Sequence, residues 1–279
     1  MSSSNLLSIV TFVYGLSAFL YIISLLFKKA LPGRVATWTT LLGLAINTAG
    51  IIMRWVESYR LGIGHAPLSN LYESLVFFSW MIILIYLIIE RGYKNPIVGA
   101  FATPMAFLAM AYASLSPNIN SRIEPLLPAL KSNWLIAHVF TCFIGYAALA
   151  IAFGISLMYL LKQKDREDKN GILASFPGAS VLDELTHQMV MLGFLFLTIG
   201  IITGSVWANS AWGRYWGWDP KETWSLITWL IYVSVLHARL MLGWRGRRIA
   251  YLSIIGFMAV LFTYFGVNLL PGLHSYGQS

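Results

Sequence analysis

Eight apolar stretches follow one another along this chain of 279 residues. They lie near residues 5–27, 35–53, 70–89, 97–115, 134–161, 189–207, 223–242 and 249–270. A helix of about 20 apolar residues crosses roughly 30 Å of hydrocarbon, and the backbone groups inside a bilayer must be paired within the helix itself. The pattern therefore predicts an all-α integral membrane protein with about eight transmembrane helices.

The low content of charged residues agrees with this prediction. Only 11% of the residues are charged, whereas a soluble domain carries about 25%. This deficit excludes an ordinary cytosolic globular protein. No internal repeat or low-complexity linker interrupts the chain, so residues 1–279 are predicted to form a single polytopic membrane domain.

The positions of the basic residues predict an orientation. Thirteen of the 19 Lys and Arg residues belong to the side reached after the first, third, fifth and seventh stretches, and six belong to the other side. Cytoplasmic loops carry the excess of Lys and Arg, so both termini are expected on the outer side. The net charge of +8 is spread in small groups between apolar stretches, which does not indicate a nucleic-acid-binding face.

The missing motifs exclude several classes of chemistry. A single cysteine, Cys142, excludes a disulfide framework, a CxxC redox pair and a cysteine-based zinc or iron–sulfur site. There is no HExxH or HxxxH pattern for zinc, and no GxGxxG or Walker motif for a nucleotide. Cys142 shares a helical face with His138, and we expect it to be a small buried residue.

The five histidines fall mostly on the outer side of this topology. His65, His138 and His274 are expected there, and only His187 is expected on the inner side. His237 lies 14 residues into the seventh stretch, or about 21 Å along the helix, and is predicted within the membrane. An imidazole in hydrocarbon is a functional hypothesis by default, although a hydrogen bond between helices is the alternative.

The tryptophans are concentrated between the sixth and seventh stretches. Six of the eleven lie within 23 residues: Trp207, Trp212, Trp216, Trp218, Trp224 and Trp229. Residues 208–222 are predicted to be an external tryptophan-rich loop, in which Gly213 and Gly217 allow tight turns. Asp219 is expected to cap the next helix, with Pro220 at its first position.

A rigid aromatic surface beside histidines suits a metal macrocycle. Haem iron accepts axial imidazoles, and the porphyrin needs apolar walls. The haem propionates would find basic partners among Arg214, Lys221, Arg54 and Arg60. In the segment NLYESL, Asn70 and Glu73 have the spacing of a capping box, and a contact from Glu73 to haem or a partner is the alternative.

The segment WGRYWGWDPKETW at 212–224 resembles the WWD signature of haem-handling membrane proteins. This chain is similar to the CcsA/ResC family, the integral-membrane subunit of System II cytochrome c maturation. Three further segments resemble that family: GHAPLSNLYESL at 64–75, WLIAHV around His138, and YFGVNLLPGLHSYG at 264–277.

The resemblance implies a set of site residues. His138 and His274 would be axial ligands of haem b at the outer face, and His237 would serve a haem within the membrane. The WWD signature adds the remaining haem-binding positions, which are Trp212, Gly213, Trp216, Trp218, Asp219 and Trp224. For Asp219, helix capping alone would explain the residue, and a catalytic role is the alternative.

The resemblance also implies a function. The chain would carry haem to the outer face and take part in its covalent attachment to the CxxCH motif of apocytochrome c. It would do so as a subunit of a cytochrome c synthase, or haem lyase, with a Ccs1/ResB-type membrane partner. The functional loops would be periplasmic in a bacterial cytoplasmic membrane, or lumenal in a thylakoid membrane. A haem exporter or carrier without ligation activity, and an electron-transfer subunit, remain alternatives.

Overall fold

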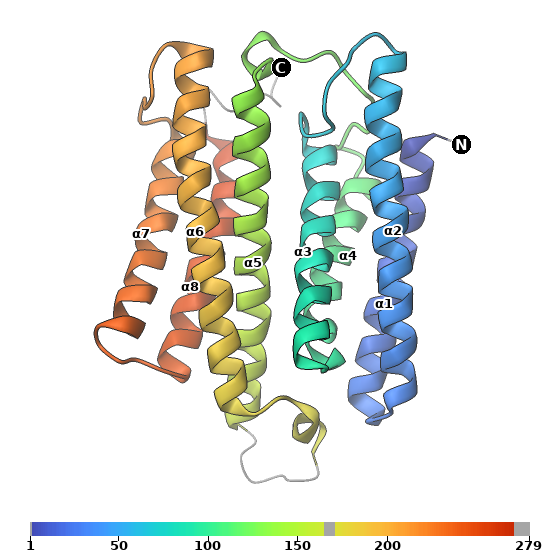
Figure 1. The fold of residues 1–279 in the computed structure, drawn as a ribbon, viewed down its shortest axis with the longest axis vertical. Coiled ribbons are helices and arrows are strands. Elements are labelled where there is room, and N and C mark those ends of the chain that lie inside the picture. Colours follow the sequence, from blue (N-terminus) through green and yellow to red (C-terminus); the bar gives the residue numbers. More distant parts are fainter. Residues whose placement is uncertain (1, 165–170, 271–279) are drawn as a thin grey trace. The chain divides into compact units, whose positions relative to one another are not determined.

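The computed structural model describes residues 2–164 and 171–270, and all the regular secondary structure in these residues is helical, with no strand (Figure 1). The eight α-helices are α1 (Ser3–Phe27), α2 (Ala30–Arg60), α3 (Leu71–Tyr93), α4 (Gly99–Leu115), α5 (Asn133–Lys164), α6 (Ala179–Trp212), α7 (Pro220–Leu240) and α8 (Arg247–Tyr264). Three short 3-10 helices lie in the connections between them, η1 (Pro96–Val98), η2 (Pro128–Leu130) and η3 (Ile172–Ser175), and a fourth, η4 (Gly266–Leu269), follows α8. The predicted all-α class is confirmed.

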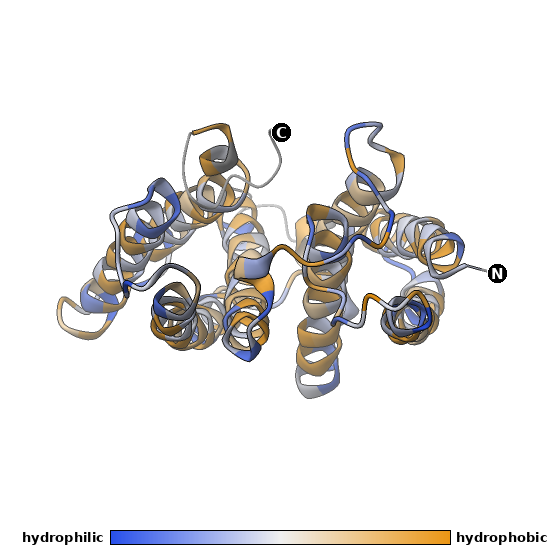
Figure 2. Cartoon of the chain, turned by 90° about the horizontal axis from the view of Figure 1, so that it is seen from above, coloured by the Kyte–Doolittle hydropathy of each residue, from blue (hydrophilic) through white to orange (hydrophobic). Residues whose placement is uncertain are grey.

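Seven of these helices are long and apolar enough to cross a membrane. The exception among the described helices is α7, which carries Lys221 and Glu222 in its first turn and Arg239 in its last. Hydrophobic residues cover most of the helical ribbon (Figure 2). Large apolar side chains are exposed along the helices, among them Phe12 at 70% and Trp38 at 73%. Such surfaces suit lipid, because soluble proteins rarely expose extended apolar patches.

The helices form two compact units. One contains α1 to α4 with η1, η2 and η3, and the other contains α5 to α8 with η4. The sequence predicted one polytopic domain and offered no boundary inside it. The division lies in the connections on either side of α5, which carry no repeat or linker signature.

In the first unit, a buried ion pair joins α2 to α3. Arg54 Nε lies 2.7 Å from Glu73 Oε1, and the two side chains are 2% and 0% exposed. The remaining guanidinium nitrogens donate to the carbonyl oxygens of Ser121 and Arg122 at 2.8 and 3.1 Å. Arg54 was expected as one possible partner of a haem propionate. That expectation is wrong in this structure, because Glu73 and two carbonyls occupy its guanidinium.

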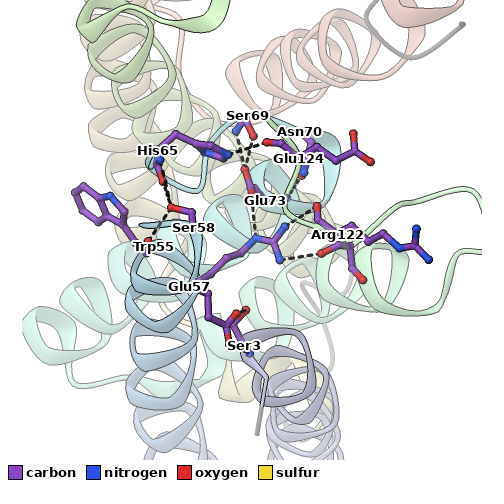
Figure 3. A network of polar contacts seen from close by, with 12 residues as sticks. Ser3, Trp55, Glu57, Ser58, His65, Ser69, Asn70, Glu73, Arg122 and Glu124 are labelled. Atoms are coloured by element: carbon purple, nitrogen blue, oxygen red, sulfur yellow. Dashed lines mark hydrogen bonds and ion pairs between the residues drawn. The ribbon is translucent and has the colours of Figure 1, made fainter. Parts of the chain in front are cut away.

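Glu73 also organises the start of α3 (Figure 3). Its second oxygen accepts hydrogen bonds from the backbone N–H and the hydroxyl of Ser69, both at 2.8 Å. Asn70 Oδ1 accepts from the Glu73 N–H at 2.9 Å, so the predicted N-cap is confirmed. The carboxylate reaches Ser69 rather than Asn70, so only half of the capping box forms in its usual way.

His65 lies in the same network and is 6% exposed. Its Nδ1 lies 2.8 Å from the carbonyl oxygen of Ala66, and its Nε2 lies 3.1 Å from that of Glu124. The backbone N–H of His65 donates a hydrogen bond to the hydroxyl oxygen of Ser58, and the same hydroxyl donates to the backbone carbonyl oxygen of His65. His65 therefore ties the 61–70 connection to the 116–132 connection (Figure 3).

We predict that Glu73→Ala destabilises the protein by about 3–5 kcal/mol, because it leaves the Arg54 charge buried without a counter-ion. Thermal unfolding in detergent measures the change. Glu124→Ala is the matched control, because it also replaces a glutamate by alanine but at an exposed position. Its expected effect on the free energy of unfolding is within about 0.5 kcal/mol. Equal melting temperatures for the two variants would contradict a structural role for the buried pair.

Candidate functional site

The tryptophan-rich segment spans the junction of α6 and α7 in the second unit. α6 continues to Trp212, and Gly213 ends it in the left-handed conformation with φ +73°. The Gly213 N–H donates to the carbonyl oxygen of Asn209 at 2.9 Å. Trp212 was expected in the loop, and this was wrong: it is the last helical residue, because the turn at Gly213 comes after it. The connection itself covers residues 213–219.

Asp219 begins α7 as predicted. Its Oδ2 accepts from the Lys221 N–H at 3.1 Å, and Pro220 occupies the first helical position. Glu222 completes a capping box by accepting from the Asp219 N–H at 3.1 Å. Asp219 is 7% exposed. Capping and burial account for this residue type here, and its catalytic role remains a prediction.

The tryptophans form two pairs of contacting rings. Trp207, which is 3% exposed, meets Trp212 edge-on, with centroids 4.9 Å apart. Trp216 and Trp218 meet edge to face at 5.7 Å and 87°. Trp218 is 68% exposed, so its ring is available to a ligand or partner. Trp224 packs on Phe262 of α8 at 4.2 Å, inside the unit.

His138 lies in the second turn of α5 and joins the first of these pairs. Its ring stacks on Trp207 with centroids 5.9 Å apart and planes 14° apart. Its Nδ1 lies 2.7 Å from the carbonyl oxygen of Gly200 in α6. A carbonyl can only accept, so Nδ1 carries the proton. In the neutral ring, the lone pair is then on Nε2.

Glycines of α6 make room for this arrangement. A Cβ on Gly204 would lie 2.6 Å from His138 Nδ1, and a Cβ on Gly200 would lie 2.6 Å from Cys142 Sγ. Nearer the start of α6, Gly193 faces Leu149 of α5 in the same way. Our reading of the sequence missed these positions. Gly200 and Gly204 form a GxxxG pattern inside an apolar stretch, which is the signal for close helix packing that could have found them.

Cys142 is the buried small residue that the sequence predicted. It is 8% exposed, and its Sγ lies 3.6 Å from His138 Nδ1. It packs against Gly200 of α6.

Of the other two predicted ligands, His237 is among the residues that the structure describes. His237 is exposed in the last turn of α7, three residues before the helix ends at Leu240. It is nearer to the helix end than expected, because α7 ends two residues earlier than the predicted stretch. His274 lies outside the described residues.

The remaining basic candidates are distributed over both units. Arg214 is exposed, and its guanidinium lies against Gly217, where a Cβ would be 2.7 Å from Cζ. Lys221 is half-buried in the first turn of α7. Arg60 is exposed at the end of α2 in the other unit. In the second unit, Arg214 and Lys221 therefore remain as charged candidates close in sequence to the exposed tryptophan.

The comparisons with known proteins all point to one family. Residues 68–274 match the family model described as "Cytochrome C assembly protein". The chain is 42% identical over 275 residues to cytochrome c biogenesis protein CcsA of Parasynechococcus marenigrum, covering 90% of this chain and 88% of the relative. It is 38% identical to CcsA of a Synechococcus species over 320 aligned positions, covering 99% and 98% of the two chains.

A solved structure shares the fold. Cytochrome c heme lyase CcmF superposes with a TM-score of 0.69 at 17% sequence identity, covering 96% of this chain and 50% of that one. The chain thus corresponds to half the length of that protein, and the likeness concerns the fold alone. Since the family model spans most of the sequence and the relatives align over nearly all of it, this integral membrane chain belongs to the cytochrome c assembly protein family, with the CcsA proteins of cytochrome c biogenesis.

Proposed function

We propose that this chain, which as a CcsA-family protein acts in cytochrome c maturation, holds haem b at the outer end of its second unit for covalent attachment to apocytochrome c. Haem is here the substrate that is carried and presented. The predicted Ccs1/ResB-type partner would complete the synthase. The excess of Lys and Arg on the opposite side supports an outer, periplasmic or lumenal, position for the tryptophan-rich connection and for both termini.

The observation that carries the proposal is the environment of His138. A metal-binding histidine usually donates its second ring nitrogen to a carbonyl or carboxylate, which fixes the tautomer and the orientation of the ring. The 2.7 Å contact from Nδ1 to the Gly200 carbonyl does this, and the stacked Trp207 restrains the ring plane. His138 therefore has the tautomer and the rigidity that an axial ligand through Nε2 requires.

The chemistry of the tryptophan-rich connection fits haem as well. Trp216 Nε1 is buried and has no hydrogen-bond partner among the described residues. An unmet buried donor costs about 1–3 kcal/mol, and a propionate oxygen is the kind of acceptor that would remove this cost. Arg214 lies against Gly217 of the same connection and can supply positive charge. The exposed face of Trp218 offers an apolar wall.

The protein's contribution to the ligation is expected to be positional. Two substrate thiols add to the haem vinyl groups: each sulfur bonds to one vinyl carbon, and a hydrogen is added to the other. The only thiol in this chain, Cys142, is buried, so the attacking sulfurs belong to the CxxCH motif of apocytochrome c. Holding the ring in one pose converts this addition into a reaction between positioned groups.

The remaining histidines complete the proposed route. His274 would provide the second ligand at the outer face. His237 would serve haem on its way through the membrane, and its exposure on α7 supports a second ligand from the partner. Release of haem without ligation is the competing function. The test is co-expression with the partner and a CxxCH reporter, scored by covalently bound haem.

We predict that His138→Ala and His274→Ala each abolish haem bound at the outer face, because each removes an axial ligand. Absorption spectra of the purified protein and the yield of covalent haem on the reporter measure the loss. Free imidazole should restore part of both signals, since it can occupy the vacated coordination position. Unchanged spectra in both variants would contradict the assignment of the ligands.

Gly204→Ala is expected to weaken haem binding without altering a ligand. Its Cβ would lie 2.6 Å from His138 Nδ1, so the ring must leave the Gly200 carbonyl. Loss of such a supporting contact typically lowers metal affinity by about 10–100-fold. Haem titration measures the affinity. Gly92→Ala is the matched control, because nothing lies within 4 Å of a Cβ at this helical glycine.

His237→Ala is predicted to lower the amount of haem that reaches the outer site while leaving the affinity of that site unchanged. Haem content after expression measures delivery, and titration of the purified protein with haem measures affinity. A variant that is normally loaded during expression would show that His237 has no part in the route.

A further inference from the structure

Trp218 has a backbone conformation that its side chain disfavours. Its φ is +56°, in the left-handed region where a Cβ crowds the backbone. Among the described residues, two other non-glycine residues have positive φ, Lys28 and Lys94. Both are C-caps of helices, where this conformation is common. Trp218 ends no helix, so its conformation must be held by its surroundings.

The side chain of Glu222 holds both neighbours of Trp218. Glu222 Oε2 accepts from the Gly217 N–H at 2.7 Å and from the Asp219 N–H at 3.1 Å. The carbonyl oxygen of Trp218 accepts from Thr223 Oγ1 at 3.3 Å. Backbone N–H groups that converge around a left-handed residue form a concave site for an anion. Here a carboxylate of the same chain fills that site.

Helix capping does not account for this contact. A capping box needs only the bond from the N-cap N–H, which Asp219 supplies. The shorter bond, to Gly217, reaches a residue two positions before the cap. Asp219 caps α7 separately, because its own carboxylate accepts a hydrogen bond from the backbone N–H of Lys221. The extra bond therefore constrains the connection, with Trp218 between its two anchored amides.

We propose that Glu222 is a positioning residue that locks Trp218 in its left-handed conformation and so presents the indole as a wall for haem. The lock is a property of the haem-free protein, and its purpose rests on the proposed function. Trp218 displays 68% of its surface while its edge-to-face contact with Trp216 sets the angle of the ring. Without the carboxylate, the backbone relaxes and the indole loses its fixed direction.

The first test is hydrogen exchange in the haem-free protein, followed in the peptide that covers residues 213–219. Glu222→Ala should raise exchange at the Gly217 and Asp219 amides by roughly tenfold or more, because bonds to a charged acceptor are lost. Glu222→Gln keeps one acceptor oxygen and should give a smaller rise. Asp219→Ala removes the cap but leaves the carboxylate in place, and it controls for fraying of α7. Equal protection in Glu222→Ala and the wild type would overturn the lock.

The second test asks whether strain at Trp218 is what Glu222 opposes. Trp218→Gly makes the left-handed conformation acceptable without help. In that background, Glu222→Ala should raise exchange by less than in the wild-type background, because the bonds to the carboxylate are still lost but no strain is released with them. An equal rise in both backgrounds would show that Glu222 holds the connection without opposing strain, and would overturn that part of the proposal.

The third test uses bound haem. Glu222→Ala should lower haem retention, and imidazole should not restore it, because both histidines are still present. His138→Ala should respond to imidazole in the same assay. Faster exchange with normal haem retention would overturn the role in presentation and leave the lock itself standing. Normal haem in His138→Ala would instead contradict the proposed function, whatever the exchange data show.

Discussion

The close approach of α5 and α6 is the contact on which the candidate site depends. The two helices run antiparallel, and three glycines of α6 accept larger side chains of α5 in register: Gly193 faces Leu149, Gly200 faces Cys142, and Gly204 faces His138. Without a Cβ at these positions, the α5 side chains reach the backbone of α6. This is why the Gly200 carbonyl is within hydrogen-bond distance of the imidazole. The same contact that packs the helices therefore selects the tautomer of His138.

Two carboxylates organise the connections that precede α3 and α7 by the same physical means. Glu73 and Glu222 each lie three residues after the N-cap of a helix, and each accepts from backbone N–H groups before that helix. Glu73 also neutralises a buried arginine, so its site is closed and structural. Glu222 acts on a connection whose tryptophan remains exposed. Equivalent sequence positions thus serve stability in one unit and, in our proposal, presentation of a ligand in the other.

Much of the candidate site could be read from the sequence because the signals were local. The cluster of six tryptophans, the Asp-Pro helix start and the Asn70 cap each depend on residues a few positions apart. Other features depend on partners far along the chain. Arg54 seemed available to a propionate until Glu73 and two distant carbonyls were found around it. The stacking of His138 on Trp207 joins residues that are 69 positions apart.

The sequence by itself determined the all-α membrane fold, because its apolar stretches are about 20 residues long, and a helix of that length crosses the hydrocarbon with its own backbone groups paired. It also determined the concentration of tryptophan and the cap of α7, which are properties of short segments. Only the tertiary structure decided which nitrogen of His138 bears the proton, which arginine is already paired, and how Trp218 is held. For His138 and Arg54, this depends on where a carbonyl or carboxylate from a distant part of the chain comes to lie. For Trp218, it depends on how the side chain of Glu222, four positions further along, turns back onto the connection. Burial makes such an acceptor decisive, because a polar group removed from water must find its partner within the protein.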